Sequence, residues 1–421
     1  MNAFLTSKHG RFISHALLLW ALLAMITTPL GAGVTQAALL ISVVGLSVYL
    51  WRNRAYAFAD TTTVVRWLLI AALIQLSLSV FHGLTARALH LPVLIAVSAL
   101  SVGLWRTSRP NPAVFWQGLC AAAIAAGLFA LYQRYALGIP RAHGWHNPIL
   151  FGDIAMGMGL MCLAGLVAKL HGQAQTARSA LSLLPYVLGI LFGVIASILS
   201  GSRGGWLAFV LCFIPLYSYT KSWRLIGAGV LIAGAVVVGL VLTPKTHLLE
   251  RAQQVVSDLK AYKAGNAATS LGVRIELNRA SLLIAKDNPV AGVGSKEFRP
   301  QVQALIDSKV LLPIPLEAFN DTHNELTDAL FKGGLIGVLS ILILYIAPLA
   351  YFYRAMRRGN VHSRAIALAG ALFMFSAIDF GLTVNLLTVQ IGKAYYCIML
   401  SVLIGLCSSL HGQAEPTASP R

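Results

Sequence analysis

Polar residues that could do acid–base chemistry gather in one seven-residue segment, Asn-Asp-Thr-His-Asn-Glu-Leu, centred on His323. It lies between a long hydrophilic stretch and an apolar run. An imidazole with a pKa of about 6.5 suits a general base or a positioned acceptor near neutral pH. Asp321, Asn324 and Glu325 are close enough in sequence to orient or tune the ring. Equally, Asp321 or the threonine after it could cap the next helix, with His323 in its solvated first turn.

A second polar patch is the sequence Ser-Gly-Ser-Arg-Gly-Gly-Trp at residues 200–206, a very short connection between two apolar runs. Arg203 would then open a helix, where unpaired backbone N–H groups and the positive end of the helix dipole attract anions. Glycines let an oxyanion approach the backbone and a guanidinium adds paired donors, so the patch suits a phosphate. The alternative is an interfacial arginine whose side chain reaches toward lipid headgroups.

Two further arginines lie in the long hydrophilic stretch. Arg274 and Arg279 are five residues apart in a predicted helix, which places them about 140° apart and therefore on different faces. One of them can face a cavity at the membrane while the other remains a solvated charge. For Arg279 we favour the solvated position.

The segment 141–148, Arg-Ala-His-Gly-Trp-His-Asn-Pro, forms a fourth patch. Arg141 could add a phosphate contact, and His143 and His146 are three residues apart. The glycine and the proline favour an irregular loop, and no carboxylate or thiol completes a set of ligands. We therefore predict no metal site here.

The elements that must position these residues are membrane helices. Hydrophobic residues make up 57% of the chain and charged residues 11%, and the mean hydropathy is +0.74, which excludes an ordinary soluble domain. Apolar runs of about 17–25 residues, long enough to cross a hydrocarbon core of about 30 Å, begin near 12, 34, 63, 90, 113, 149, 183, 204, 223, 333, 364 and 389. We predict an all-α polytopic membrane protein with about twelve transmembrane helices. The first run is expected to be a retained span, and the five cysteines, all inside apolar runs, predict neither disulfides nor zinc.

The connections between the apolar runs differ in charge. Leaving the long hydrophilic stretch aside, one side holds most of the basic residues of the termini and short connections, namely Lys8, Arg11, Arg52, Arg54, Arg66, Arg106, Arg109, Lys169, Arg178, Lys221, Arg224, Arg354, Arg357, Arg358 and Arg364. The positive-inside rule makes this side, and both termini, cytoplasmic. The net charge of +18 is thus partly a signal of topology, and no nucleic-acid-binding pattern accompanies it.

The predicted organisation follows from these runs. Residues 1–243 would hold nine membrane helices, residues 321–410 three more, and residues 411–421 a short cytoplasmic tail. Residues 244–320 would form one large loop on the opposite, periplasmic side, because they are hydrophilic and contain seven of the 14 acidic residues, interleaved with basic ones.

Two amphipathic helices fit this loop, at about 246–263 and about 272–287. The second places Val273, Leu277, Ala280 and Ile284 on one face. The pair Asn-Pro at 288–289 should stop it, and Gly-Val-Gly at 292–294 should form a turn.

Taken in order, these motifs resemble the superfamily of O-antigen ligases and O-antigen polymerases. The motifs are Ser-Arg-Gly-Gly after an apolar run, Arg274 with Asn-Pro-Val-Ala-Gly-Val-Gly at 288–294, and His323-Asn-Glu followed by Gly-Gly-Leu-Ile-Gly at 333–337. The resemblance covers roughly residues 140–340. In its length, its number of spans and its single dominant loop, the chain is most similar to the ligases.

The resemblance implies a glycosyltransferase of GT-C-like architecture in the bacterial inner membrane, metal-independent, inverting and without a cofactor. It would transfer a polysaccharide from undecaprenyl diphosphate to a sugar hydroxyl of lipid A–core oligosaccharide, among membrane lipids, in lipopolysaccharide biosynthesis. His323 would be the general base, and Arg203 and Arg274 would hold the donor diphosphate. Further substrate or supporting contacts would come from Arg141, His146, Asp321, Asn324, Glu325 and Arg279.

Three other functions remain in view. An O-antigen polymerase would use the same chemistry on a different acceptor. A protein O-oligosaccharyltransferase would be expected to have a longer C-terminal region. A lipid-linked glycan transporter would be expected to show repeats and broken helices with ionisable groups near the midplane. Here the candidates gather at one membrane surface, although Asp153 and Asp379 lie within predicted spans and therefore need partners.

Overall fold

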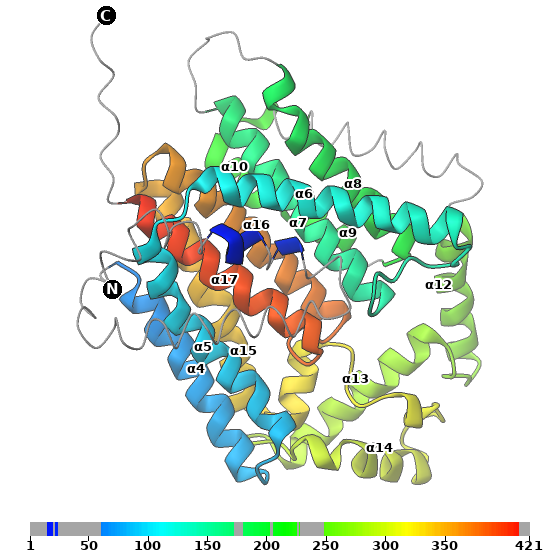
Figure 1. The fold of residues 1–421 in the computed structure, drawn as a ribbon. Helices are drawn as coiled ribbons and strands as arrows, with labels where there is room; N and C mark the ends of the chain where they lie inside the picture. The colour runs from blue at the N-terminus through cyan, green and yellow to red at the C-terminus, as the bar shows by residue number, and fades with distance from the viewer. Residues whose placement is uncertain are drawn as a thin grey trace, which may run out of the picture.

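The structure of the protein is a computed structural model that describes residues 15–19, 22–23, 60–171, 180–202, 205–224, 227 and 248–411. Every regular element in these residues is helical (Figure 1), which confirms the all-α prediction for this part of the chain. The apolar runs near 12, 34 and 223, including the predicted first span, lie wholly or largely outside the described residues.

The membrane-type helices come first and last in the chain, on either side of a more polar segment (Figure 1). The first group is α4 (Thr62–Phe81), α5 (Ala86–Ser108), α6 (Pro112–Leu131) with the π-helical turn η1 (Tyr132–Ala136), α7 (Pro148–His171), η2 (Ala180–Ser182), α8 (Leu184–Ser200), α9 (Gly205–Leu211) and α10 (Phe213–Thr220). The polar segment holds α12 (Leu248–Lys263), α13 (Ser270–Asp287), η4 (Ser295–Glu297), α14 (Phe298–Asp307) and η5 (Leu316–Ala318). The last group is α15 (Glu325–Arg358), α16 (Val361–Thr383) and α17 (Gln390–His411).

Seven of the described helices are long and apolar enough to cross a membrane: α4, α5, α6 with η1, α7, α15, α16 and α17. Two shorter apolar stretches, α8 and the pair α9–α10, accompany them. The predicted starts near 63, 90, 113, 149, 183, 204, 364 and 389 coincide with helix starts to within a few residues, whereas α15 begins at Glu325, ahead of the predicted 333. The chain is a polytopic helical protein, and the number of about twelve spans stays a prediction.

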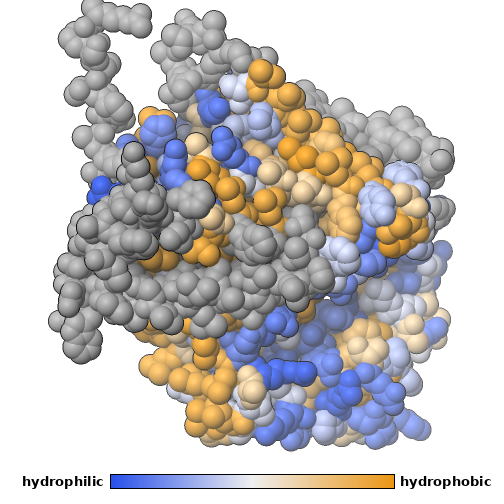
Figure 2. Space-filling view, in the orientation of Figure 1, coloured by the Kyte–Doolittle hydropathy of each residue, from blue (hydrophilic) through white to orange (hydrophobic). Residues whose placement is uncertain are grey.

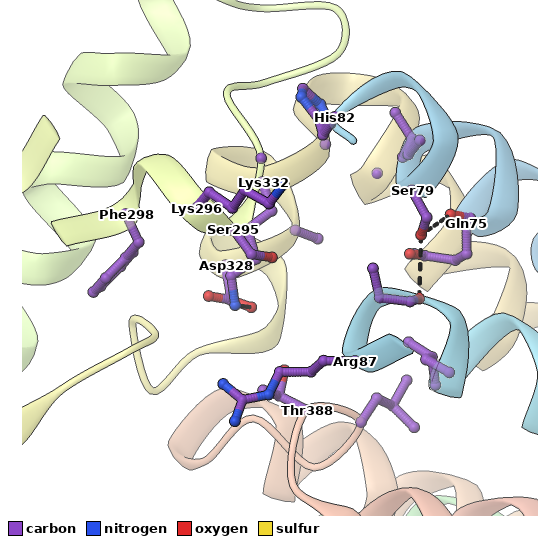
Figure 3. Close-up of a pocket in the computed structure, with 18 of the residues that line it drawn as sticks. Gln75, Ser79, His82, Arg87, Ser295, Lys296, Phe298, Asp328, Lys332 and Thr388 are labelled. Atoms are coloured by element: carbon purple, nitrogen blue, oxygen red, sulfur yellow. Dashed lines mark hydrogen bonds and ion pairs between the residues drawn. The ribbon is translucent and has the colours of Figure 1, made fainter. Parts of the chain in front are cut away.

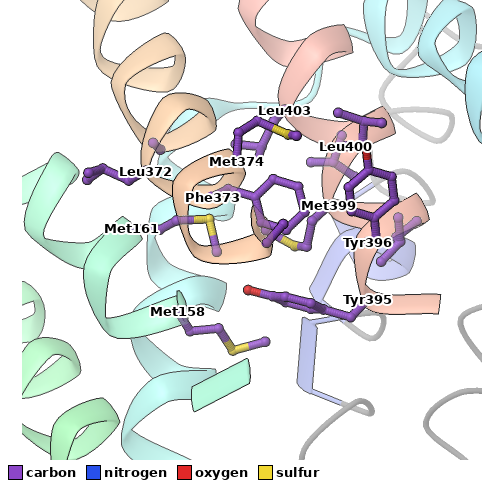
Figure 4. Packing of buried hydrophobic residues seen from close by; sticks show 14 of the residues in the cluster. Met158, Met161, Leu372, Phe373, Met374, Tyr395, Tyr396, Met399, Leu400 and Leu403 are labelled. Carbon is purple, nitrogen blue, oxygen red and sulfur yellow. The ribbon is translucent and has the colours of Figure 1, made fainter. Parts of the chain in front are cut away.

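The centre of the bundle is formed by α7, α16 and α17. In its most apolar stretch α17 is 100% buried, against 28% for α4, so α17 is screened on all sides. Figure 4 shows Phe373 and Tyr395 packed beside Met158 and Met161, and the two rings meet edge to face at 5.5 Å. Methionine fills the irregular gaps that rigid rings leave. One consequence is that Lys393, in the first turn of α17, is enclosed as well.

The two ends of the bundle can be told apart by the side-chain bonds that join helix ends. Arg106 Nε and Ser408 Oγ both donate to Asp60 Oδ1, at 2.9 and 2.5 Å, and Asn360 Nδ2 donates to the Leu410 carbonyl at 2.6 Å. The end of α5, the start of α16 and the end of α17 therefore meet at one end. This end carries the basic connections predicted to be cytoplasmic. The opposite end holds the connections after α4, α6, α8 and α16.

Helices α12–α14 form a polar layer at that opposite end, in the lower right of Figure 1 and in the hydrophilic region of Figure 2. The layer has its own small core, made of Val273, Leu277, Ala280, Ile284, Phe298, Val302, Leu311, Leu316 and Phe331. The predicted amphipathic face of α13 is therefore confirmed. Phe331 belongs to α15, so the layer is fastened to a membrane helix.

Helix α15 is broken at Gly334, whose φ of +59° and ψ of −154° are accessible essentially to glycine alone. The break frees backbone groups that the segment 289–294 satisfies. The amides of Val293 and Gly294 donate to the carbonyls of Phe331 and Lys332, both at 3.0 Å. In return, the amides at 335 and 336 donate to the carbonyls at 289 and 290. The two glycine motifs, 288–294 and 333–337, thus interlock.

The contacts at the break require glycine twice. A Cβ on Gly292 would lie 2.5 Å from the Phe331 carbonyl oxygen, and a Cβ on Gly334 would lie 2.4 Å from the Val290 backbone. The part of α15 after the break, 335–358, is long enough on its own to cross a core of about 30 Å. The break therefore lies at one end of the span and not at the midplane where a transporter is expected to place it.

Candidate active site

His323 lies in a strained turn directly before α15. Its φ is +54°, in the left-handed region that residues other than glycine rarely adopt. The backbone amide donates to Asp321 Oδ1 at 3.0 Å, and ring Nδ1 lies 3.2 Å from the same oxygen. The ring packs edge to face on Phe319, with centroids 5.3 Å apart. Such strain persists only where the surroundings impose it, and it aims the imidazole.

The Asp321 carboxylate supports the ring electrostatically. Burial opposes its ionisation, but the hydrogen bonds from the His323 ring and amide outweigh that effect, so the pKa of Asp321 lies below its ordinary value. Asp321 is therefore charged at neutral pH. When Nδ1 carries the proton that Asp321 accepts, Nε2 keeps a lone pair, and no described residue hydrogen-bonds to it. This is the tautomer that a general base needs.

The other two polar neighbours of His323 hold the backbone. The Asn324 side chain caps α15 by accepting from the amides of Leu326 and Thr327, so the cap is Asn324, and the alternative that Asp321 or Thr322 caps this helix is wrong. Glu325 is buried and accepts from the Leu387 amide at 3.1 Å, which ties α15 to the connection before α17. Glu325 thus points away from His323.

Helix α13 is clamped to the His323 turn by Asn278, a residue that sequence reasoning missed. Its Nδ2 donates to the carbonyls of Arg274 and Thr322, at 2.6 and 3.4 Å, and its Oδ1 accepts from Thr327 Oγ1 at 2.5 Å. Arg274 lies one helical turn, about 5.4 Å, before Asn278. The clamp therefore brings the Arg274 turn of α13 beside the His323 turn.

The two arginines of α13 have different environments, as their spacing predicts. Arg279 is half exposed, and its guanidinium lies 3.8 Å from the buried Glu276 carboxylate. Arg274 is partly buried and close enough to Asp153 of α7 to interact with it electrostatically. Arg274 is therefore the inward-facing member of the pair, and Arg279 is a solvated charge.

The two buried acids inside the spans, Asp153 and Asp379, accept hydrogen bonds from the connection after α8 and from α9. Asp153 Oδ1 accepts from Ser202 Oγ at 2.5 Å, and Asp379 Oδ2 accepts from the Ala208 amide at 2.7 Å. Arg203 itself lies outside the described residues, between these two anchored flanks.

The 141–148 loop meets the same connection. Arg141 Nε donates to the Ser200 carbonyl at 2.9 Å, which joins the loop to the end of α8. His146 is exposed, and its amide donates to the His143 carbonyl within an irregular turn. Among the described residues no group of three possible ligands surrounds a metal-sized space.

A cavity of about 390 Å³ lies between α4, α5, the 294–299 segment and the first turns of α15 and α17 (Figure 3). Of the residues singled out from the sequence, Glu325 lines it, whereas neither His323 nor Arg274 does. Its basic lining residues, among them Arg87, Lys332 and Lys393, lie in separate helices, so no local motif could have predicted them.

Chemically, the described site offers an oriented imidazole and a cation brought to the same end of the bundle. The first can accept a proton from a hydroxyl, and the second can stabilise charge on an oxyanion.

Comparison with known proteins assigns a family to this arrangement. Residues 188–342 match the O-antigen ligase family. An O-antigen ligase from Escherichia coli K12 is 27% identical over 151 residues, which is 35% of this chain and 36% of that protein. An O-antigen ligase from Salmonella typhimurium LT2 is 26% identical over 179 residues, 40% of each chain. An uncharacterized protein of Haemophilus influenzae is 26% identical over 280 residues, 66% of this chain and 69% of that protein.

These matches place residues 188–342 of the chain with the O-antigen ligase family and support the O-antigen ligase and polymerase superfamily as its relatives. The matched region begins in α8 and ends within α15, so it contains Arg203, Arg274 and His323 as well as the interlocked glycine motifs. Helices α4–α7 lie outside it. The chain spans well under half the length of the two curated ligases that it matches.

Proposed function

We propose that the protein is an O-antigen ligase that transfers a polysaccharide from undecaprenyl diphosphate to a sugar hydroxyl of lipid A–core oligosaccharide, with inversion, at the periplasmic face of the inner membrane. The observation that carries the proposal is the Asn278 clamp, which holds the Arg274 turn of α13 beside the Asp321-oriented His323 within the family-matched region. A nucleophile activator and a leaving-group stabiliser are what such a transfer needs.

His323 acts on the acceptor. A sugar hydroxyl is a weak nucleophile, so Nε2 takes its proton as the oxygen attacks the anomeric carbon of the donor. Asp321 stabilises the imidazolium that forms, because its hydrogen bond to Nδ1 becomes charge-assisted. A general base of this kind contributes about 10²–10⁴ in rate.

Arg274 and Arg203 act on the donor. As the new bond forms, the bond between the anomeric carbon and the diphosphate oxygen breaks, and its electron pair stays on the diphosphate. Guanidinium groups with two parallel donors suit this developing charge. In this role they supply the positive charge that a divalent ion supplies in many glycosyltransferases.

Attack from the face opposite the diphosphate explains why acid–base and cationic groups come from different elements. His323 precedes α15, Arg274 belongs to α13, and Arg203 follows α8. Both substrates are lipids that diffuse in the bilayer, so the reaction is best placed where membrane helices meet a polar layer.

The test is a reconstituted transfer in vesicles with purified undecaprenyl-diphosphate-linked polysaccharide and rough lipopolysaccharide, read as a mobility shift on a gel. His323→Ala should lower the initial rate by about 10²–10⁴. The matched control is His362→Ala, because His362 is exposed at the start of α16, at the other end of the bundle. It should retain the rate of the unmodified protein.

Two results would overturn the proposal. Normal attachment of polysaccharide by His323→Ala would remove the base from the mechanism. Products in which the donor glycan itself is lengthened, with rough lipopolysaccharide unchanged, would make the protein a polymerase.

A further inference from the structure

The cavity beside the His323 turn is strongly basic. Its described lining includes five cationic residues, Arg87, Lys296, Arg299, Lys332 and Lys393, against two carboxylates, Glu325 and Asp328. Figure 3 shows Arg87 reaching in from α5 on one side, and Lys296 and Lys332 on the other. The wall is fixed in place because His82 Nε2 bonds the Ala291 carbonyl at 2.7 Å, which joins α4 to the interlocked loop.

The carboxylates do not neutralise this charge. Asp328 forms an ion pair with Lys332, with Oδ2 2.6 Å from Nζ, and Glu325 accepts a hydrogen bond from the Leu387 amide. Arg299 donates to the carbonyls of Glu317 and Phe319, so its guanidinium is held by the loop. Three cations, Arg87, Lys296 and Lys393, are left without an acidic partner among the described residues.

Lys393 is the most informative of the three. It is 6% exposed, yet its ammonium makes no hydrogen bond or ion pair with any residue that the structure describes. Its charge is close enough to those of Arg87 and Lys332 to be repelled by them, and close enough to Glu325 to be attracted by it. An enclosed lysine without an ion pair costs free energy, and an anionic ligand in the cavity would lower that cost.

The cavity is distinct from the Arg274 site and adjoins the same turn. It is lined by Asn320, Glu325 and Asp328, which flank His323, but by no residue of α7, α8, α9 or α13. Resting on the proposed function, which assigns the donor diphosphate to Arg203 and Arg274, we propose that this basic cavity binds phosphate groups of the acceptor glycolipid. His323 would then lie between the two substrates.

The experiment measures binding without turnover. The full-length protein is placed in phosphatidylcholine nanodiscs and titrated with rough lipopolysaccharide, either intact or chemically dephosphorylated. Lys393→Met and Arg87→Gln should each weaken binding of the intact glycolipid about tenfold or more, the loss of one charge-assisted contact. Binding of the dephosphorylated form should be weak and unaffected. The control is Lys286→Met, an exposed lysine of α13 that does not line the cavity.

Each alternative outcome is informative. Unchanged binding of intact lipopolysaccharide to both variants overturns the proposal, as does an equal loss with the dephosphorylated form. If the same variants instead weaken binding of undecaprenyl-diphosphate-linked glycan, the cavity serves the donor. If phosphatidylglycerol in the nanodisc competes as well as lipopolysaccharide, it is a general headgroup site. Arg87 is exposed, so Arg87→Gln remains a test even where Lys393→Met does not fold.

Because no donor is present, this experiment is independent of catalysis. A protein that binds intact lipopolysaccharide through Lys393 but never transfers glycan to it would disprove the proposed function and leave the cavity assignment standing. If both cavity variants transfer glycan at the normal rate, the proposed function stands and the cavity assignment is wrong.

Discussion

The two sides of the His323 turn differ in how their charges are matched. On the α13 side, Arg274 approaches Asp153, Arg279 approaches Glu276, and Asp321 bonds the histidine ring. On the cavity side, Arg87, Lys296 and Lys393 have no acidic partner among the described residues. Charges matched within the protein hold elements in place, whereas an enclosed charge without an ion pair, which of these three is Lys393, marks where a ligand supplies the missing sign.

The largest expected effect is on the matched side. Arg274→Ala should lower the transfer rate by about 10²–10³, as removal of one stabiliser of developing negative charge does in other enzymes. Arg274→Lys should remain severely impaired, because an ammonium lacks the paired donors. The assay is the reconstituted gel shift.

The control for this comparison lies on the same helix. Arg279→Ala removes a half-exposed guanidinium of the same chemistry and should leave the rate within about twofold, since exposed ion pairs contribute at most about 1 kcal/mol. Equal losses in both variants would mean that the face of α13 is immaterial and that Arg274 has no special role.

Substitutions on the two sides should shift the melting temperature of the protein in different directions. Arg274→Ala removes a partly buried side chain from the turn of α13 that Asn278 joins to the His323 turn, so its melting temperature should fall, by about 2–4 °C for each kcal/mol lost. Lys393→Met removes an enclosed charge that neighbouring cations repel, so in the absence of substrate it should melt at or above the temperature of the unmodified protein. The measurement is thermal unfolding in detergent. A Lys393→Met protein that melts lower than Arg274→Ala would show that Lys393 is a structural residue.

These differences explain what the sequence could predict. Runs of apolar residues predicted the starts of the described membrane-type helices to within a few residues, except that of α15, and periodicity identified the buried face of α13, because both signals are local. The angle between Arg274 and Arg279 predicted that they lie on different faces of α13, but not which of the two is the more buried. The capping role of Asn324, in contrast, depends on which of four adjacent polar residues adopts extended backbone, and composition does not decide that.

The remaining features required three-dimensional contacts. The interlock of 288–294 with 333–337 is visible in sequence only as two glycine motifs, since the backbone bonds between them join residues about forty positions apart. The basic cavity draws its cations from α5, α14, α15, α17 and the loop before α14, and each of them alone is an ordinary charged residue near a helix end. Asn278 joins two segments that the sequence gives no reason to pair.

The smallest expected effect concerns pH and belongs to the Asp321–His323 pair. The pKa of the Asp321 carboxyl is lowered in the folded protein, so it contributes stability that is fully present above its unfolded pKa of about 3.9. That contribution is lost as the pH falls through this value toward the lower folded pKa. Asp321→Asn should therefore melt below the unmodified protein at pH 7, and the gap should close as the pH falls below about 4. A gap that stays constant from pH 7 to pH 3 would mean that the amide perturbs the turn by shape alone, and that the charge on Asp321 does not orient the ring.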